Sequence, residues 1–420
     1  MSHKTTVLPN GITVITETMP SVRSISLGLW FNVGTRDERA DQAGLAHFME
    51  HMMFKGTKSR DAYDISMQFD RLGAEYNAFT SREYTCFYAR FVDDKLKAAL
   101  EILADMVINS TFAQEAINTE REVVIEEIAR SEDTPDDFIF DLYTSSNLPS
   151  HELGLPVLGT REAVGSYVHD NCQEFHDEYY CTGNLVLSAA GNVDHETLLA
   201  LVQDLFEPMR KAPKHLRHLS VPKYGKGVFA QTRDIEQAHV VYGVPWFGIG
   251  DARRYAAGVL TTLLGGSMSS RLFQEIREQR GLAYSIYATQ GSYQGAGQWC
   301  VYAGTRPGNL SEVVGLITAE LTKLVEQPVP EEELNRTIDF ISGQFLLGLE
   351  TTNSHMVRLG KREVLGLEQI SAQEQVERYK SVTAGDVQTL AVDMLTQPPT
   401  VAVVSAYTQE EVTEQLSQYV

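Results

Sequence analysis

Two short stretches of this sequence recur at one fixed separation along the chain. LWFNVG (29–34) matches VPWFGIG (244–250) in its tryptophan, phenylalanine and glycine. The shift that carries Trp30 onto Trp246 also carries LVLSAA (185–190) onto VAVVSA (401–406). Two motifs at one separation indicate a duplicated domain more than coincidence. The chain is therefore expected to fold into two copies of one architecture.

The length of the chain agrees with this duplication. A chain of 420 residues is too long for one ordinary core and fits two domains of roughly 200 residues each. The stretch EPMRKAPKHLRHLSVPKYGKG (207–227) contains three prolines and a basic cluster, without apolar periodicity. It is the candidate linker. We therefore expect a first domain over residues 1–213 and a homologous second domain over residues 222–420.

Local patterns indicate an α+β fold. The Asn-Gly pair in VLPNGITVITE (7–17) lies between β-branched runs, which is a strong hairpin signal. SISLGLWFNVG (24–34) is typical of a buried strand, DQAGLAHFMEHMMF (41–54) of a helix and EYTCFYARF (83–91) of an alternating strand. Each copy is expected to be a mostly antiparallel sheet packed with helices.

Composition excludes several classes of partner. The formal charge of -21 has no long acidic run, which argues against binding nucleic acid or an anionic membrane and favours cationic peptides. No stretch approaches the roughly 18 apolar residues of a membrane span, and the first residues do not resemble a signal peptide. We expect a cytoplasmic protein. The four scattered cysteines are expected to be free thiols.

The stretch HFMEH (47–51) places two histidines and a glutamate in an otherwise apolar helical segment. On a helix His47 and His51 lie about 40° apart and Glu50 is on the neighbouring flank. Buried ionisable groups are destabilising unless they are paired or bound to a metal, and His-x-x-Glu-His is a zinc peptidase motif. Two satisfied histidines on a helix are the alternative. At the shift that relates the two copies, the positions of the two histidines and the glutamate are occupied by Leu263, Gly266 and Ser267 in the second copy. The fold alone therefore does not explain why the first copy has the polar residues.

A third ligand is expected because catalytic zinc usually takes three protein ligands. AQEAINTEREVVIEEIARSED (113–133) is predicted to be a helix. Its helical period places Glu120 and Glu127 on the apolar face, and Glu122 and Glu126 outside it. Two carboxylates on the apolar face would be strongly destabilising without a cation. A metal ion would make one of them a ligand and let the other support the site.

These residues resemble the pitrilysin-like, or M16, metallopeptidases, a family that includes insulin-degrading enzyme and the mitochondrial processing peptidase. The family pattern is His-x-x-Glu-His followed much later by the ligand glutamate, with another glutamate seven residues before it; here Glu127 follows His51 at the family's spacing. The resemblance implies that His47, His51 and Glu127 bind zinc, that Glu50 is the general base and that Glu120 supports the site. It covers essentially the whole chain and implies a zinc-dependent endopeptidase acting on peptides or unfolded segments.

The resemblance also suggests where a substrate binds. GAEYNAFTSREYTCFYARF (73–91) is similar to the family's substrate-binding edge strand. Asn77, Ala78 and Phe79 are the positions assigned to an extended peptide, which an exposed edge can hold by strand addition. An ordinary turn and strand is the alternative.

In the second copy, SSRLFQEIREQRGLAYSIYA (269–288) is predicted to be a helix ended by Gly281 and followed by a strand. Arg277 and Tyr284 match the family's arginine and tyrosine pair, which holds substrate or the developing oxyanion; without the resemblance this spacing would mean nothing. In the long members of the family, the half that carries the arginine and tyrosine faces the zinc-binding half across a closed chamber. A chain of 420 residues corresponds to only one such half. The resemblance therefore implies a homodimer in which Arg277 and Tyr284 complete the partner's zinc site.

Two other interpretations deserve comparison. HDNCQEFHDEYYC (169–181) contains four histidines and cysteines but no Cys-x-x-Cys knuckle, so a second, structural zinc site is disfavoured. A noncatalytic core or assembly subunit is the rival class, because respiratory core subunits share this fold after losing their ligands. The intact ligand set favours the enzyme.

Overall fold

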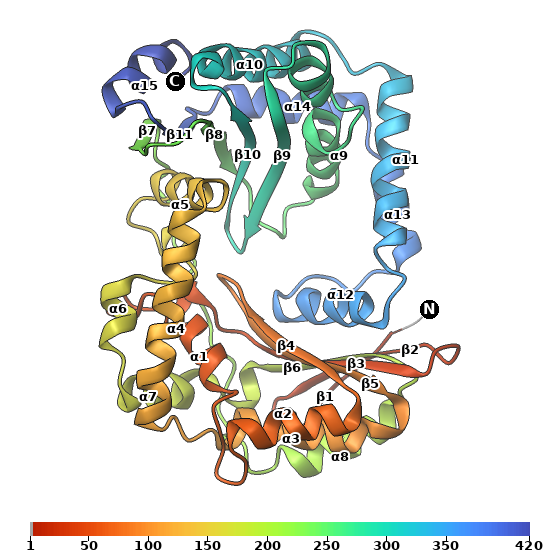
Figure 1. Ribbon diagram of the computed structural model, residues 1–420. Helices are drawn as coiled ribbons and strands as arrows, with labels where there is room; N and C mark the ends of the chain where they lie inside the picture. Colours follow the sequence, from red (N-terminus) through yellow and green to blue (C-terminus); the bar gives the residue numbers. More distant parts are fainter. Residues whose placement is uncertain (1–2) are drawn as a thin grey trace. The chain divides into compact units, whose positions relative to one another are not determined.

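The computed structural model describes residues 3–420, which form two compact units, each built around one sheet (Figure 1). The first unit comprises the described residues up to Ala129 together with Leu155–His218 and Gly348–Ser371. The second unit comprises Arg130–Gly154, Leu219–Leu347 and Ala372–Val420. The compact units therefore do not coincide with two contiguous halves of the chain, because each includes a segment from the other half.

The first unit contains a six-stranded sheet. In spatial order its strands are β1 (His3–Val7), β2 (Thr13–Thr18), β6 (Leu185–Gly191), β3 (Ser24–Phe31), β5 (Thr85–Val92) and β4 (Glu75–Thr80). Among these described strands only the β2–β6 pair is parallel. The predicted opening hairpin is β1–β2, where Gly11 adopts a φ of 96° in the turn. Glycine favours this left-handed conformation because it has no Cβ.

Eight helices carry described residues of the first unit. They are α1 (Leu45–Met52), α2 (Ala62–Leu72), α3 (Leu96–Asn109), α4 (Gln114–Asp133), α6 (Arg161–Ser166), α7 (His169–Tyr179), α8 (His195–Leu205) and α12 (Thr352–Val364). Figure 1 shows α2, α3 and α8 on one face of the sheet and α12 across the other. The larger core lies on the first of these faces and includes Leu27, Phe48, Phe87 and Leu100. Each such buried side chain contributes about 1.5–3 kcal/mol of hydrophobic stabilisation.

The second unit repeats this plan with five described strands. In spatial order they are β7 (Gly227–Thr232), β11 (Thr400–Ser405), β8 (Ala238–Trp246), β10 (Ala296–Thr305) and β9 (Ala283–Tyr293). Within this set the β7–β11 pair alone is parallel. Its helices are α5 (Pro135–Asn147), α9 (Arg254–Gly265), α10 (Leu310–Glu326), α11 (Glu331–Leu347), α13 (Ala372–Lys380), α14 (Ala384–Leu395), α15 (Gln409–Leu416) and a π-helical segment, Phe273–Gln279. The predicted α+β class and mostly antiparallel sheets are confirmed.

Each unit covers the second face of its sheet with one helix from the other half of the chain. In the first unit α12 packs on β3 and β6. In the second unit α5 packs on β8 and β11. These strands occupy equivalent places in the two sheets. The duplicated halves have therefore exchanged equivalent helices, which a division of the sequence into contiguous domains could not show.

The predicted pairing of the two tryptophans is wrong in register. Trp30 faces α12, where its indole Nε1 donates to Ser188 Oγ at 2.8 Å and a Cβ on Gly360 would overlap its ring. Trp246 instead lies in the core that contains Leu260 of α9. Because successive side chains of a strand alternate between faces, the two tryptophans are not equivalent.

Two close-packed glycines give a better alignment of the central strands. Gly28 lies against Met356 of α12, and Gly243 lies against Tyr143 of α5. The separation of these two glycines along the chain is one residue shorter than that of Trp30 and Trp246. An alignment on the glycines matches the side of β3 that faces α12 with the side of β8 that faces α5. The duplication is therefore real in architecture, although its sequence signal was offset by one residue in these strands.

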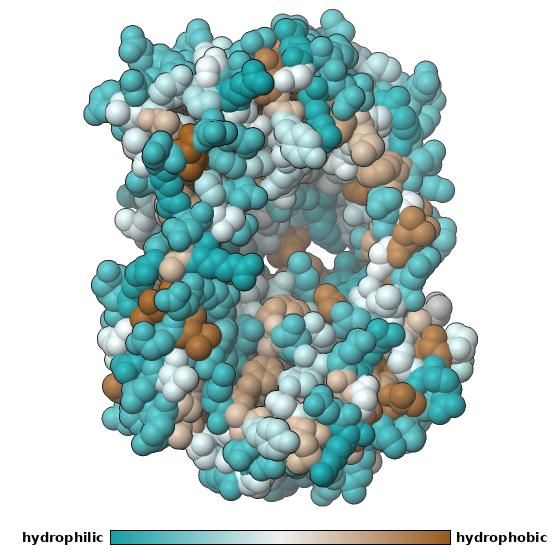
Figure 2. Space-filling view, in the orientation of Figure 1, coloured by the Kyte–Doolittle hydropathy of each residue, from teal (hydrophilic) through white to brown (hydrophobic). Residues whose placement is uncertain are grey.

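The face drawn in Figure 2 is predominantly hydrophilic, and its hydrophobic residues form small, separate patches. Among residues 3–420, none of the helices combines the length and hydropathy that crossing a bilayer requires. All four cysteines are free, as predicted, and all four are buried.

Candidate metal centre

Helix α1 carries the His-x-x-Glu-His stretch, and its start is fixed by two features. Gly44 has a φ of 91°, and a Cβ there would overlap the backbone of Gly159. The buried Glu38 carboxylate accepts hydrogen bonds from the backbone N–H groups of Gly44 at 2.8 Å and Ala46 at 2.7 Å. Its oxygens satisfy free backbone donors at this end of the helix. Burial raises the pKa of Glu38 to about 8, although the two backbone hydrogen bonds oppose this shift. Glu38 was missed in the sequence because it lies outside the helical pattern.

Three possible metal-binding atoms converge in the first unit. His47 Nε2 and His51 Nε2 are 3.2 Å apart. Glu127 Oε2, from α4, lies 3.7 Å from each of these nitrogens. Among residues 3–420, these three residues form the one group of His, Cys, Asp or Glu side chains close enough to share a metal ion. The two helices therefore bring together residues that lie far apart in the sequence.

The donor set fits zinc. Zinc–nitrogen bonds of about 2.0–2.1 Å in a tetrahedral site place neighbouring donors roughly 3.3 Å apart, close to the separations between these atoms. Burial, reinforced by the nearby His51, lowers the pKa of His47 to about 3, so its imidazole is neutral and able to act as a ligand. His47 Nδ1 is buried without a hydrogen-bond partner among the described residues. A neutral ring with its Nε2 in this cluster is the state that a metal requires.

The second imidazole is oriented by hydrogen bonding. Glu120 Oε1 lies 2.8 Å from His51 Nδ1, and Glu120 Oε2 lies 2.6 Å from Lys55 Nζ. Burial alone would lower the pKa of His51, but Glu120 and the other nearby carboxylates raise it. Burial alone would raise the pKa of Glu120, but His51 and Lys55 lower it. The ionised Glu120 therefore accepts from Nδ1 and leaves Nε2 facing the cluster.

Glu50 lies on the same helix with one of its oxygens held. Thr80 Oγ1, at the end of β4, donates to Glu50 Oε2 at 2.6 Å. Burial raises the pKa of Glu50, and the Thr80 hydrogen bond opposes this shift. A carboxylate with a raised pKa is a stronger base. The sequence did not point to the contacts of Thr80 with Glu50 and of Lys55 with Glu120, because neither Thr80 nor Lys55 belongs to the ligand pattern.

Helix α4 presents the carboxylates as its period predicted. Its buried residues are Ile117, Glu120, Val124 and Ile128. The Glu127 side chain is 43% exposed, so it lies at the edge of this face beside the two rings. Glu122 and Glu126 are exposed to solvent. The acids beside the two histidines are thus separated from the solvated ones.

Comparisons with known proteins agree with this geometry. The family models Insulinase (Peptidase family M16) and Peptidase M16 inactive domain match residues 13–161 and 167–340. A relative named an uncharacterized zinc protease of Streptomyces coelicolor is 40% identical over 406 residues, covering 95% of this chain and 88% of the relative. The chain belongs to peptidase family M16.

Other relatives support the membership. A protein named an uncharacterized zinc protease of Bacillus subtilis is 37% identical and covers 94% of this M16 chain and 96% of its own length. The solved structure of a protease from Helicobacter pylori aligns with a TM-score of 0.90 at 21% identity, covering 96% of this chain and 99% of that one. A structure described as a peptidase M16 inactive domain from Pseudomonas fluorescens gives 0.91 at 17% identity, with 97% and 99% covered. These structures share the fold over the whole chain.

The expected substrate strand of this M16 chain is an edge strand. Strand β4 pairs only with β5 among the described strands of the first sheet. Asn77 is exposed, and its Oδ1 accepts a hydrogen bond from Ala78 N at 2.8 Å. Phe79 packs edge-on against Trp30 with ring centroids 5.5 Å apart. The other side of β4 has no strand neighbour in the described sheet.

Arg277 and Tyr284 belong to the second unit of the M16 chain and lie next to each other. Arg277 is in the π-helical segment, and its guanidinium carbon is 4.9 Å from the centre of the Tyr284 ring and 4.7 Å from that of Phe273. The predicted helix ends at Gly281, whose φ is 61°. Tyr284 is 80% exposed. π-Helical turns are frequent at functional sites.

The histidines and cysteines of residues 169–181 have other partners. His176 Nε2 donates to the Val107 carbonyl at 2.8 Å, and its ring stacks on Tyr180. Cys172 lies in the hydrophobic core of the first unit. These contacts give the segment a packing role.

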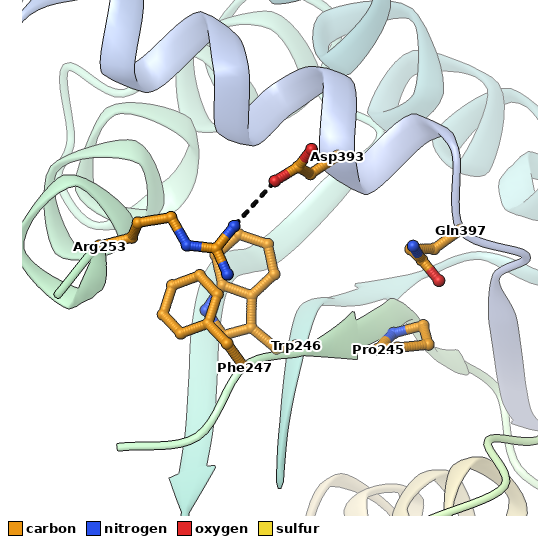
Figure 3. A pocket seen from close by; sticks show the side chains of 6 residues that line it. All are labelled: Pro245, Trp246, Phe247, Arg253, Asp393 and Gln397. Atoms are coloured by element: carbon orange, nitrogen blue, oxygen red, sulfur yellow. Dashed lines mark hydrogen bonds and ion pairs between the residues drawn. The ribbon is translucent and has the colours of Figure 1, made fainter. Parts of the chain in front are cut away.

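The second unit contains a half-open hollow of about 400 Å³. Its lining residues are Pro245, Trp246, Phe247, Arg253, Asp393 and Gln397. Figure 3 shows the Arg253 guanidinium over Phe247 and paired with Asp393, while Gln397 and Pro245 lie across the opening. The ion pair within the hollow satisfies its charged groups, and its described lining has no histidine or cysteine to act as a metal ligand.

Proposed function

We propose that this protein is a zinc-dependent endopeptidase that hydrolyses peptides or unfolded segments, with Glu50 as the general base. The observation that supports this most is the triangle of His47 Nε2, His51 Nε2 and Glu127 Oε2, with sides of 3.2, 3.7 and 3.7 Å. Zinc in the names of its M16 relatives points to the same metal. A bound zinc ion would polarise the scissile carbonyl and acidify a water molecule.

The protein's own residues supply the proton transfers. Glu50 takes a proton from the attacking water and delivers it to the leaving nitrogen as the C–N bond breaks. Thr80 holds one carboxylate oxygen, so the other is free for these transfers. The free edge of β4 would hold the peptide in an extended form through backbone hydrogen bonds, with Asn77, Ala78 and Phe79 beside it.

The test is a Glu50→Gln variant assayed on an unstructured cationic peptide. Hydrolysis should fall by about 10²–10⁴-fold, the usual contribution of general acid–base catalysis, while zinc content stays unchanged. Glu122→Gln changes an exposed acid of α4 in the same way and should retain full activity. If the wild-type protein holds no zinc and cleaves no peptide, it is a noncatalytic member of the fold and the proposal fails.

We also propose a homodimer in which Arg277 and Tyr284 complete the zinc site of the partner subunit. The exposed tyrosine beside a guanidinium supports a role in holding substrate. Glu50→Gln and Arg277→Ala are each expected to be inactive, and mixing them should restore activity. Each mixed dimer would then contain one site with both residues intact. A strictly monomeric active enzyme, or mixing without rescue, would contradict this arrangement.

A further inference from the structure

Lys55 lies immediately beyond helix α1 and reaches back toward the candidate metal centre. Its Nζ is 2.6 Å from Glu120 Oε2, while Glu120 Oε1 is 2.8 Å from His51 Nδ1. One carboxylate therefore connects the ammonium group to the imidazole. Within residues 3–420, the Lys55 side chain makes no hydrogen bond or ion pair with His47, His51 or Glu127. Its influence on a bound metal would therefore pass through Glu120.

The backbone that carries Lys55 is held in place. Gly56 has a φ of 131°, which favours glycine, and its carbonyl accepts a hydrogen bond from Thr111 N at 3.2 Å. Lys55 N donates to the Met52 carbonyl at 3.1 Å. The turn is thus joined both to α1 and to the chain after α3, which gives Lys55 a defined position.

The two histidines differ in what fixes their rings. His47 Nδ1 is buried without a hydrogen-bond partner among residues 3–420, whereas His51 Nδ1 has Glu120. The Glu120 side chain is only 3% exposed, and a buried carboxylate needs its lone pairs satisfied. Without Lys55, Oε2 would lose its cationic partner and the carboxylate could turn away from His51.

Resting on the proposed function, we propose that Lys55 is a positioning residue for zinc. It holds Glu120 with one oxygen on His51 Nδ1, so that His51 presents Nε2 to the metal. Partners of this kind orient a ligand and typically account for 10–100-fold in metal affinity. The role is indirect, because Lys55 acts on the metal through Glu120 and His51.

Simple charge effects predict the opposite outcome. An ammonium group near a divalent cation repels it, so removal of Lys55 would strengthen zinc binding if charge alone mattered. Removal would weaken zinc binding if Lys55 positions Glu120. The direction of the change in affinity therefore separates the two explanations.

The experiment is a competition titration of zinc against a chelator, using the full chain. Lys55→Met should raise the zinc dissociation constant by about 10–100-fold, and Lys55→Arg should remain close to wild type. Lys58→Met, at an exposed position of the same loop, is the matched control and should have no effect. Saturating zinc should restore peptide hydrolysis in Lys55→Met, which a general folding defect would not allow.

A double mutant tests the route. In a Glu120→Gln background, Lys55→Met should produce little further loss of zinc affinity, because the link to His51 is already weakened. Unchanged or tighter zinc binding by Lys55→Met, or an equal loss in both backgrounds, would overturn the inference. If Lys55→Met does not fold, Lys55→Gln replaces it, and the same comparison with Lys55→Arg decides. A wild-type protein that binds no zinc would instead overturn the proposed function.

Discussion

Helices α1 and α9 follow the central strands β3 and β8 in equivalent sheets, but they bury different chemistry. Helix α9 buries apolar side chains such as Leu260, Leu263 and Leu264. Helix α1 buries His47 among apolar residues and holds Glu50 and His51 beside it, partly buried. The fold is therefore satisfied by an apolar helix at this place. The fold does not require the polar groups of α1, and the buried His47 Nδ1 without a partner among the described residues reduces the stability of the metal-free protein.

The exchanged helices α12 and α5 differ in a similar way. Helix α12 is attached to the first sheet through the buried pair His355 and Glu17, whose Nδ1 and Oε2 are 3.0 Å apart. Helix α5 covers the second sheet with a cluster that includes Ile139 and Tyr143. The first unit therefore places a charged pair beneath its exchanged helix, whereas the second places an apolar and aromatic cluster there.

The largest effect is expected when α1 is made more like α9. His47→Leu should abolish zinc binding and peptide hydrolysis. In the presence of chelator it should raise the free energy of unfolding by about 1 kcal/mol or more, because a buried imidazole nitrogen without a partner is removed. Denaturant unfolding with chelator measures the change.

The matched variant is His51→Leu, which should also lose zinc but should destabilise the metal-free protein. It leaves the buried Glu120 without its imidazole partner. Equal stability effects from the two substitutions would show that the two histidines have the same environment, contrary to the difference in their hydrogen bonding.

The second effect tests the packing of α12. A Cβ at Gly360 would overlap the Trp30 ring, so Gly360→Ala should reduce the free energy of unfolding by about 1–3 kcal/mol. Gly343→Ala in α11, where a Cβ would meet no atom within 4 Å, should instead stabilise by about 0.5–1 kcal/mol. Urea unfolding of the two variants gives the comparison. A neutral Gly360→Ala would show that α12 can move away from the sheet.

The sequence predicted local features well and long-range packing poorly. The period of α4 separated Glu120 from Glu122, because the helical repeat decides which side chains face the core. The alignment of Trp30 with Trp246 was wrong because the two side chains lie on opposite faces of their sheets. A shift of one residue along a strand moves every side chain to the other face. The exchange of α5 and α12 could not be predicted, since helical periodicity does not identify the sheet on which a helix packs. Thr80 and Lys55 are side-chain contacts that only the folded chain brings together.

A third, smaller effect concerns the strand beside α1. Thr80→Val removes the hydroxyl that donates to Glu50 at 2.6 Å but keeps the shape of the side chain. It should lower kcat by about 10-fold, equivalent to about 1.4 kcal/mol, with KM and zinc content unchanged, because Glu50 loses a fixed orientation. Thr80→Ser keeps the donor and should remain near wild type. Steady-state kinetics decide the point, and a change confined to KM would place Thr80 in substrate binding instead.

The smallest effect is a difference in pH dependence between two buried histidines of the first unit. The hydrogen bond to Glu17 and its charge raise the pKa of His355 despite burial, while burial lowers the pKa of His195, whose ring nitrogens contact Thr6 and Thr16. The stability from His355 is therefore fully present below its unfolded pKa of about 6.5 and is lost as pH rises through the higher folded pKa. That from His195 is present above about 6.5 and is lost as pH falls through the lower folded value.

The profile for His355 should also decline in acid. Burial alone would raise the pKa of Glu17, but His355 lowers it, so the pair loses stability as pH falls below about 4.5. Denaturant unfolding from pH 4 to 9 should show that His355→Gln is most destabilising between about pH 4.5 and 6.5, and that His195→Gln is most destabilising above that range. Parallel profiles for the two variants would mean that α12 is not attached to its sheet through a charged pair, and the contrast with α5 would then rest on packing alone.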